Sequence, residues 1–570
     1  MAQARSTAFM AAIALGALEI DASHAAHVSH QPEVPNASQY RSPSMSASLQ
    51  RLIPRVGLPI AFCDAQNASS RPSTSAKDVD SSAGYAEWLA ARGVEGLDHI
   101  TISADGTASL NSVGKQLYPS RWKRFGRSPP PAVVVAFPLD GTQVLSEATI
   151  CAEPSYAKYA DKGYNMIVMY LLIERMKAEH GLADPWMDHI AGRRFSSPIT
   201  WSFDEVDWLR GTSLYRAVMH QRESLKQEWE HGGMRQASSE IAKAAGLRSP
   251  TFEDLTWATA AFTLFAVPLS DARDNQDNPH GMHSLQIVPG LEMFSPSTGT
   301  APAGKTVCHL DIDASKHQLC VVCPPAQVAT SLSLSLSHGE DDASVEQMMF
   351  QFGSLDVDPS NEVLMIECPI PPVEEWDASI KRRFALLLEE DLRPQLFLSR
   401  RALAEIKKTA GQKARNSAER QQRFERMFPE GVRETIAIFV MDEDDLKART
   451  NDRKGTEEGA VATHDAEEAQ LAAAGMRMAV LTTVVRLLEV KQYELESEEH
   501  GTGSLAMDQR LLENINEEQR GTTAMPHSGP TVRQLAALRH RMEQKRLVRD
   551  YMEIYSEALQ NEMAHMKTLG

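Results

Sequence analysis

The sequence predicts an α+β fold in which a body of short strands and helices is followed by a helical domain. The prediction rests on changes in the spacing of apolar residues. After a short helix near Tyr85, strand-like runs lie between His99 and Pro138, and helical spacing follows between about 160 and 265. Short alternating or apolar runs separated by turn residues return at 285–370, and from Asp377 to the end the spacing is helical again.

The composition is that of a soluble globular protein, and the length allows two or three domains. Of the 570 residues 42% are hydrophobic and 24% charged, and the formal net charge is −18. So acidic a chain lacks the broad basic surface that nucleic acid or an anionic membrane requires. Direct nucleic-acid binding is therefore not expected outside three local basic stretches, which we interpret as solvated helix faces: Lys381–Arg383, Arg400–Arg401 and Arg539–Arg549. No window reaches the roughly 18 apolar residues of a membrane-spanning helix, so no membrane partner is expected.

The first 84 residues are interpreted as a largely irregular targeting region and linker. Arg5 precedes the apolar stretch Ala8–Leu18, and Ser23–Ala25 follows as a small-residue cleavage site, as in a secretory signal peptide. The next residues are rich in Ser, His and Pro and poor in acids, which suits an organellar transit segment, although Glu19 argues against a mitochondrial presequence. The sequence favours a targeting segment over a cytoplasmic location. Whether this segment directs the protein to an organelle (mitochondrion or plastid) or to the secretory pathway stays open.

The first body begins with a short amphipathic helix and two strands, and three helices follow. The expected elements are a helix at Tyr85–Arg92, strands at His99–Ser103 and Ala132–Pro138, and helices at Tyr164–Glu179, from Ser202, and from Thr251 through Phe265. Ser202 and Thr251 carry hydroxyls that can cap these helices, with Asp254 three residues beyond Thr251.

The later part of the body is expected to form an antiparallel sheet. Its strands are predicted at Val307–Ile312, Gln318–Cys323, Thr330–Leu336 and Val363–Ile366. In the helical domain, the last helix carries one Met-rich apolar stripe from Leu535 to Met566. Such a stripe is more often core than a binding face.

Several segments in a fixed order carry a resemblance to a known family. They are Tyr164–Arg175, Asp184–Ile190, Trp201–Leu214, Phe252–Ala258, Gln286–Met293, Tyr493, Asp508, Leu511–Leu512 and Arg541–Leu547. Together they resemble the SET-domain protein methyltransferases of the Rubisco large-subunit methyltransferase family over roughly residues 85–560. The resemblance implies a SET-like domain at 85–375 with a helical insert at about 160–265. It also implies a helical lobe at 376–570, similar to that family's substrate-binding lobe.

The positions that would bind S-adenosylmethionine depart from the family pattern. Leu264 and Phe265 stand where the family has a Ser-Arg pair, and Phe294, Ser295 and Pro296 follow Glu292 where an Asn-His pair normally ends the turn. The family's Gly-x-Gly loop, which lets the backbone approach the cofactor, has no counterpart between residues 101 and 128.

The position that would carry catalysis departs as well. Phe352 stands at the family's tyrosine, so the ring is present and the hydroxyl is absent, and the neighbouring tyrosine expected near Gly339 is missing. The resemblance therefore predicts a non-catalytic protein without a cofactor. Such a protein would bind another protein through the helical lobe or the vacated peptide groove, as an assembly or scaffold factor in an organelle. The alternative is an active protein-lysine N-methyltransferase that uses S-adenosylmethionine.

Two clusters of metal-ligand residue types remain, and neither is predicted to hold a metal. Cys308, His309, His317 and the Cys320–Cys323 pair have ligand types suited to zinc, but a strand would point alternate side chains to opposite faces. Buried structural cysteines are the preferred interpretation, and six cysteines in a chain of this length do not make a disulfide framework. The acidic turn Gly339–Asp342 is interpreted as a solvated loop, with calcium as its alternative.

Overall fold

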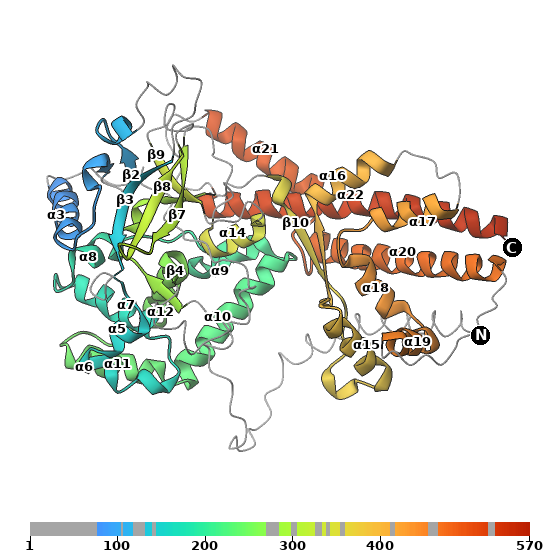
Figure 1. Ribbon diagram of the computed structural model, residues 1–570, viewed down its shortest axis with the longest axis horizontal. Helices are drawn as coiled ribbons and strands as arrows, with labels where there is room; N and C mark the ends of the chain where they lie inside the picture. Colours follow the sequence, from blue (N-terminus) through green and yellow to red (C-terminus); the bar gives the residue numbers. More distant parts are fainter. Residues whose placement is uncertain are drawn as a thin grey trace.

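The computed structural model describes residues 77–103, 107–117, 131–139, 144–269, 284–297, 305–324, 333–337, 343–353, 359–410, 417–453, 466–521 and 530–569. Two lobes lie side by side along the long axis: a body of sheet and helices, and a mainly helical lobe that begins at β10 (Figure 1). The predicted α+β class is confirmed. Most of the predicted targeting region and the acidic turn at 339–342 lie outside the described residues.

The body is built on a seven-stranded sheet with the order β1-β2-β9-β7-β8-β3, in which β6 pairs with β9. The sheet is mixed rather than antiparallel as predicted, because β9 runs parallel to both β6 and β7. Its strands are β1 Ile100–Ile102, β2 Ala108–Leu110, β3 Ala132–Pro138, β6 Ser295–Ser297, β7 Lys305–Asp313, β8 Gln318–Cys323 and β9 Ser333–Ser337. A separate pair is formed by β4 Ala266–Leu269 and β5 Ser284–Ile287.

Helices cover the body below and beside this sheet (Figure 1). They are α3 Lys77–Ala91, α5 Glu147–Cys151, α6 Pro154–Ala157, α7 Met166–Ala178, α8 Pro185–Ala191, α9 Phe203–Val206, α10 Ser213–His231, α11 Met234–Ala244, α12 Phe252–Phe265 and α14 Val345–Phe352. The 3-10 helices used below are η3 Gly114–Leu117, η5 Pro198–Thr200, η6 Asp207–Leu209 and η7 Leu291–Met293.

Both predicted helix caps are confirmed. The Ser202 hydroxyl accepts the backbone N–H of Glu205 at 3.2 Å, and the Thr251 hydroxyl accepts that of Asp254 at 3.2 Å. In each case the acidic side chain returns to the cap's own backbone N–H, which completes a capping box. One boundary was wrong: α3 starts at Lys77, inside the stretch predicted to be a linker.

The second lobe contains α15 Ala378–Glu389, α16 Arg400–Ala410, α17 Ser417–Arg426, α18 Val432–Val440, α19 Glu443–Arg453, α20 Ala466–Glu496, α21 Leu505–Gly521 and α22 Val532–Leu569. It is not all-helical, because β10 Val363–Glu367 pairs with β11 Gln395–Ser399. The strand predicted at 363–366 thus leaves the body's sheet. Leu364 and Leu398 explain why, since their face of the pair is buried in the core of the helical lobe.

The long helices α20 and α22 lie side by side and form the spine of this lobe (Figure 1). Along the Met-rich stripe of α22, Leu538, Met542, Val548 and Tyr555 are buried, as predicted for core, while Met563 is 47% exposed. Among the described helices α20 alone is, by length and composition, apolar enough to cross a membrane: within residues 470–496 it holds an 18-residue window with a mean hydropathy of 1.6. The sequence-based expectation missed this window. Half of it is buried inside the protein, as in the core helix of a folded lobe.

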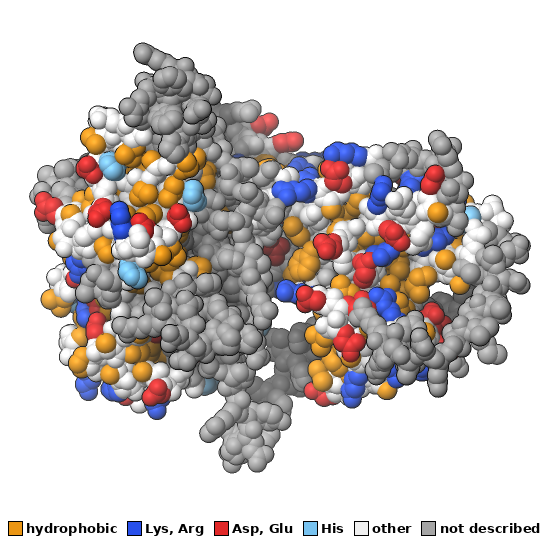
Figure 2. Space-filling model, in the orientation of Figure 1, with side chains coloured by type: hydrophobic (Ala, Val, Ile, Leu, Met, Phe, Trp, Pro, Cys, Tyr) orange, Lys and Arg blue, Asp and Glu red, His pale blue; other side chains and the backbone are white. Residues whose placement is uncertain are grey.

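The face shown in Figure 2 supports the interpretation of the basic stretches. Lysine and arginine side chains alternate with aspartate and glutamate over the helical lobe, and neither sign covers a continuous area. The Arg400 guanidinium, from one predicted stretch, is paired with the Glu543 carboxylate, and Arg382, from another, donates to Glu443 at 2.7 Å.

Candidate functional site

The residues assigned to catalysis and cofactor binding lie on three elements around one apolar core. Leu264 and Phe265 end α12, Glu292 lies in η7 with Phe294 directly after it, and Phe352 ends α14. The four apolar side chains are at most 2% exposed and share the main core cluster of the body. These four predicted positions thus lie in the packed interior of the body.

Ser295 and Pro296 lie in β6, which pairs in parallel with β9. Ser295 stands opposite Ser335 and Pro296 opposite Leu336. Proline supplies no backbone N–H to a sheet and is tolerated on a strand that is paired on one side, as β6 is in the described sheet. Ser295 and Pro296, which were matched from the sequence to an Asn-His pair, are therefore part of the sheet.

The end of α14 is held by a contact that admits only glycine. Gly353 ends the helix in the left-handed conformation, with φ 66°, and a Cβ atom there would collide with the backbone oxygen of Ser196. The Ser197 hydroxyl donates to the Phe350 backbone oxygen at 3.0 Å. These contacts fix the end of the helix, and the Phe352 side chain, 2% exposed, belongs to the core.

Aromatic rings fill the space beside the end of α12. The Phe195 ring lies 5.2 Å from that of Trp257 and meets the Phe265 ring edge-on at 5.7 Å, measured between centroids. The Trp257 indole N–H donates to the Arg193 backbone oxygen at 3.1 Å, and the Arg175 guanidinium lies 4.7 Å from the Trp257 ring. The Leu264 and Phe265 side chains thus pack the core.

Glu292 has partners for both of its carboxylate oxygens. The side chain is buried, the Tyr85 hydroxyl donates to Oε1, and the Gly290 backbone N–H donates to Oε2 at 2.7 Å. Tyr85 stacks on His189 with 4.5 Å between the ring centroids, and Arg193 Nη2 lies 2.5 Å from His189 Nε2. Burial, and then the Glu292 charge, raise the pKa of Tyr85 well above its ordinary value.

This cluster joins α3 and α8 to η7, and no sequence pattern indicated it. Tyr85 and Glu292 are 207 residues apart, and Arg193 reaches the Glu292 backbone oxygen at 3.3 Å. The Glu292 carboxylate thus ties η7 to α3 through Tyr85 and accepts its second hydrogen bond from Gly290 within the protein.

In the described part of 101–128 the one glycine is Gly114. A Cβ atom at Gly114 would collide with the His99 backbone oxygen, so this glycine allows η3 to pack closely against the segment at His99. Asp105–Gly106 and Phe125–Arg127 lie outside the described residues.

A second buried polar cluster, also missed from the sequence, joins the two lobes. Ser213 of α10 donates to the Glu346 carboxylate of α14 at 2.6 Å, and burial raises the pKa of Glu346. On the other side, the imidazole Nδ1 of His540 lies 3.2 Å from the Glu362 carboxylate, which also accepts from Gln544 at 2.6 Å. Burial, the largest single effect, lowers the pKa of His540, but the charge and hydrogen bond of Glu362 together with the Glu346 charge outweigh it and raise that pKa.

The charged residues of the family's lobe motif hold the lobe itself together. Lys545 is fully buried and donates to the Asp508 carboxylate and to the Gly503 backbone oxygen, both at 2.6 Å. Arg541 donates to Asp508 at 2.6 Å and to the Trp208 backbone oxygen in η6 at 3.1 Å. Burial lowers the pKa of Lys545, against the opposing effect of Asp508. The Lys545 and Arg541 charges are therefore paired with groups of the same chain.

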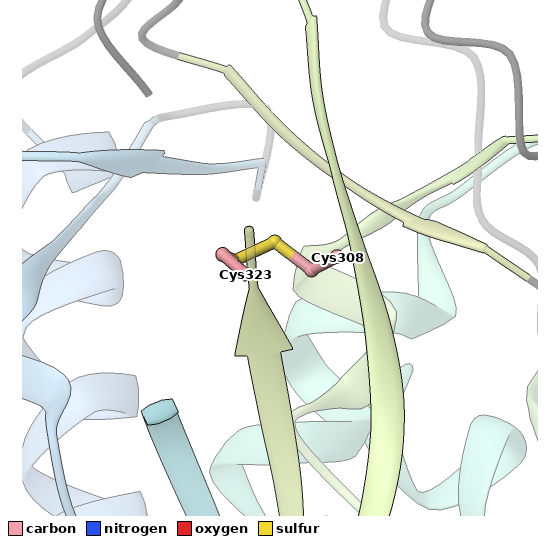
Figure 3. Close-up of a disulfide and its surroundings, with 2 residues drawn as sticks. All are labelled: Cys308 and Cys323. Atoms are coloured by element: carbon pink, nitrogen blue, oxygen red, sulfur yellow. A yellow bond between two sulfur atoms is a disulfide. The ribbon is translucent and has the colours of Figure 1, made fainter. Parts of the chain in front are cut away.

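The cysteines are structural, as preferred, but two of them form a disulfide that the sequence did not suggest. Cys308 of β7 and Cys323 of β8 are bonded across the hairpin, with Cα atoms 4.2 Å apart (Figure 3). Cys320 is buried without a disulfide and packs with Ala136 and Val322 on the opposite face of β8. Among the described residues no group of three or more metal-ligand side chains comes together. The zinc alternative thus gains no support from the described part of the hairpin.

Solved structures share this fold, whereas no protein-family model matches the sequence and no curated protein is significantly similar to it. The SET domain of LSMT bound to lysine and AdoHcy matches with a TM-score of 0.54 and 12% identity, over 84% of this chain and 91% of that chain. Rubisco LSMT bound to AdoMet matches with a TM-score of 0.54, and its complex with sinefungin and monomethyllysine with 0.53, each at 12% identity over 85% of this chain and 93% of that chain. Identity this low shows the fold alone. The chain therefore has a SET-type fold with a large helical part, and its activity has to be argued from the site.

Proposed function

We propose that this chain is a non-catalytic SET-fold protein that binds another protein and holds no cofactor. Phe352 carries the proposal. It stands at the position matched to the family's tyrosine, has no hydroxyl, and is 2% exposed in a packed core. Transfer of a methyl group depends on positioned polar groups around the reacting atoms, and a phenyl ring supplies none.

The surroundings of Glu292 and of α12 support the same proposal. The Glu292 carboxylate accepts from Tyr85 and Gly290, and Leu264 and Phe265 are core residues. The working surfaces would be the helical lobe and the groove that a peptide substrate would otherwise occupy. If the N-terminal segment proves to be a transit peptide, an assembly or scaffold role in an organelle fits best.

Calorimetric titration of the purified chain with S-adenosylmethionine tests the proposal. We expect no saturable heat up to about 1 mM ligand, which corresponds to less than about 4 kcal/mol of binding free energy. A SET methyltransferase of the same fold, titrated in the same buffer, is the positive control. Saturable binding in the micromolar range would overturn the proposal.

The second candidate is an active protein-lysine N-methyltransferase that uses S-adenosylmethionine. The observation that favours it is the retained fold, shared with methyltransferase structures that hold AdoMet or its analogues. Incubation with tritiated S-adenosylmethionine and lysine-containing peptides separates the candidates. We expect no label transfer from the wild-type chain or from Phe352→Tyr. Transfer by the wild type would establish the enzyme, and transfer only by Phe352→Tyr would show that the hydroxyl alone is limiting.

A further inference from the structure

A pocket of about 460 Å³ lies between α9, η6 and α10. This is within the size range of ligand sites in proteins. Its lining residues include Phe203, Trp208, Tyr215 and Met219. The last three pack against an apolar cluster distinct from the one that contains Phe352, so the pocket is separate from the family's cofactor positions.

The aromatic lining is open to solvent and already suited to guanidinium groups. Phe203, the first residue of α9, is 73% exposed, a position where a polar residue would be expected. On one side of the Phe203 ring the Arg222 guanidinium lies 5.2 Å from the centroid, and the Arg541 guanidinium lies 5.3 Å from the centroid of Trp208. Both distances are in the range of attractive cation–π contacts. Solitary exposed apolar side chains are ordinary on protein surfaces, but here they gather in one concave site.

Two carboxylates complete the lining. Among the residues that the structure describes, the Asp204 carboxylate has no hydrogen-bond or ion-pair partner, and it lines the pocket beside Phe203. Asp207 pairs with Arg210 at 3.1 Å, but their side chains are 52% and 36% exposed, so this contact is weak and exchangeable. A cation that enters the pocket would therefore meet at least one free negative charge and the ring surfaces that Arg222 and Arg541 leave open.

We propose that this pocket binds an arginine side chain displayed by a partner protein. Arginine fits better than lysine because its planar guanidinium can stack on a ring while it donates two parallel hydrogen bonds to a carboxylate. The net charge of −18 also favours the approach of a basic partner. The inference deepens the proposed protein-binding role and rests on it, but it involves none of the cofactor positions.

Fluorescence anisotropy with a labelled peptide, two arginines in a Gly-Ser background, tests the pocket on the full chain. A second peptide carries citrulline at both positions, which keeps the shape and removes the charge, and a third carries lysine. We expect saturable binding of the arginine peptide that weakens as salt rises. Lysine should bind more weakly and citrulline weakest. Equal affinity for the arginine and citrulline peptides, or no saturable binding, would overturn the proposal.

Variants locate the binding. Asp204→Asn and Phe203→Ala should each weaken the arginine peptide about two- to fivefold, and the double variant about tenfold, as expected for the loss of one exposed charge and one ring face. Asp98→Asn and Leu182→Ala, whose side chains are 73% and 66% exposed outside the pocket, should leave binding unchanged. Asp204→Asn removes no contact seen in the described structure, so it should fold. Equal effects of the pocket and control variants would overturn the site. Binding of S-adenosylmethionine by calorimetry would instead overturn the non-catalytic role and leave the peptide result standing.

Discussion

Removal of the Tyr85 hydroxyl tests whether Glu292 is a structural carboxylate. In Tyr85→Phe the ring can keep its buried place on His189, but Glu292 Oε1 loses its donor. A hydrogen bond to a charged group contributes about 1.5–3 kcal/mol, and a buried group left without its partner costs about as much. Because Gly290 still serves the other oxygen, we expect the free energy of unfolding of the body to fall by about 2 kcal/mol.

The loss should be visible in thermal and urea unfolding followed by circular dichroism. A change of about 2 kcal/mol corresponds to about 4–8 °C in Tm for a body of this size. Tyr493→Phe is the matched control, because its ring is 55% exposed and its substitution should change stability by less than about 0.5 kcal/mol. A double-mutant cycle with Glu292→Gln should give a coupling energy above about 1 kcal/mol.

Two results would refute this reasoning. One is a Tyr85→Phe protein as stable as the Tyr493→Phe control, and the other is a coupling energy near zero in the cycle with Glu292. Either would mean that the contact between Tyr85 and Glu292 does not stabilise the body in solution. Glu292 would then return to the candidates for ligand binding.

Three further outcomes are expected. Gly353→Ala should cost more than about 3 kcal/mol, because a Cβ atom would collide with backbone, whereas Gly181→Ala, at nearly the same φ with no atom within 4 Å, should cost about 1 kcal/mol; equal losses in urea unfolding would contradict this. Reduction of the disulfide between Cys308 and Cys323, which closes a loop of 15 residues, should lower stability by about 3 kcal/mol and leave two buried thiols that alkylate once the chain unfolds, and unchanged urea midpoints would count against it. The raised pKa of Tyr85 favours the neutral phenol in the folded state, so its contribution should be full below a pH of about 10 and decline above it in pH-dependent melts; no such decline relative to Tyr85→Phe would contradict it.

Local features of the fold could be predicted from the sequence. The caps at Ser202 and Thr251 depend on side chains within three residues of their backbone partners. Strands β3 and β8 were placed at their observed bounds because their apolar runs are short and bounded by turn residues. The pairing of β10 with β11 could not be predicted, since it depends on which buried face the helical lobe offers to Leu364.

In the candidate site, too, local motifs could be predicted and long-range contacts could not. The sequence identified Phe352 and Glu292 through their place in a motif, and the structure puts both in the body's interior. It gave no indication that Tyr85 would donate to Glu292, because nothing in one sequence pairs residues so far apart. The disulfide was missed for a related reason: Cys308 and Cys323 become neighbours only once the register of β7 against β8 is fixed.

The landmarks that carry the family resemblance are parts of the scaffold in this structure. The Trp257 indole N–H holds a backbone oxygen at 3.1 Å, and Lys545 is buried on Asp508. Gly211, with φ 83°, lies where a Cβ atom would collide with the backbone of α20, so it allows the body to approach the helical lobe. None of these contacts needs a cofactor or a reacting amine. A chain that keeps these contacts keeps its scaffold whatever residue stands at position 352, so the resemblance indicates the fold, and activity has to be tested at the site itself.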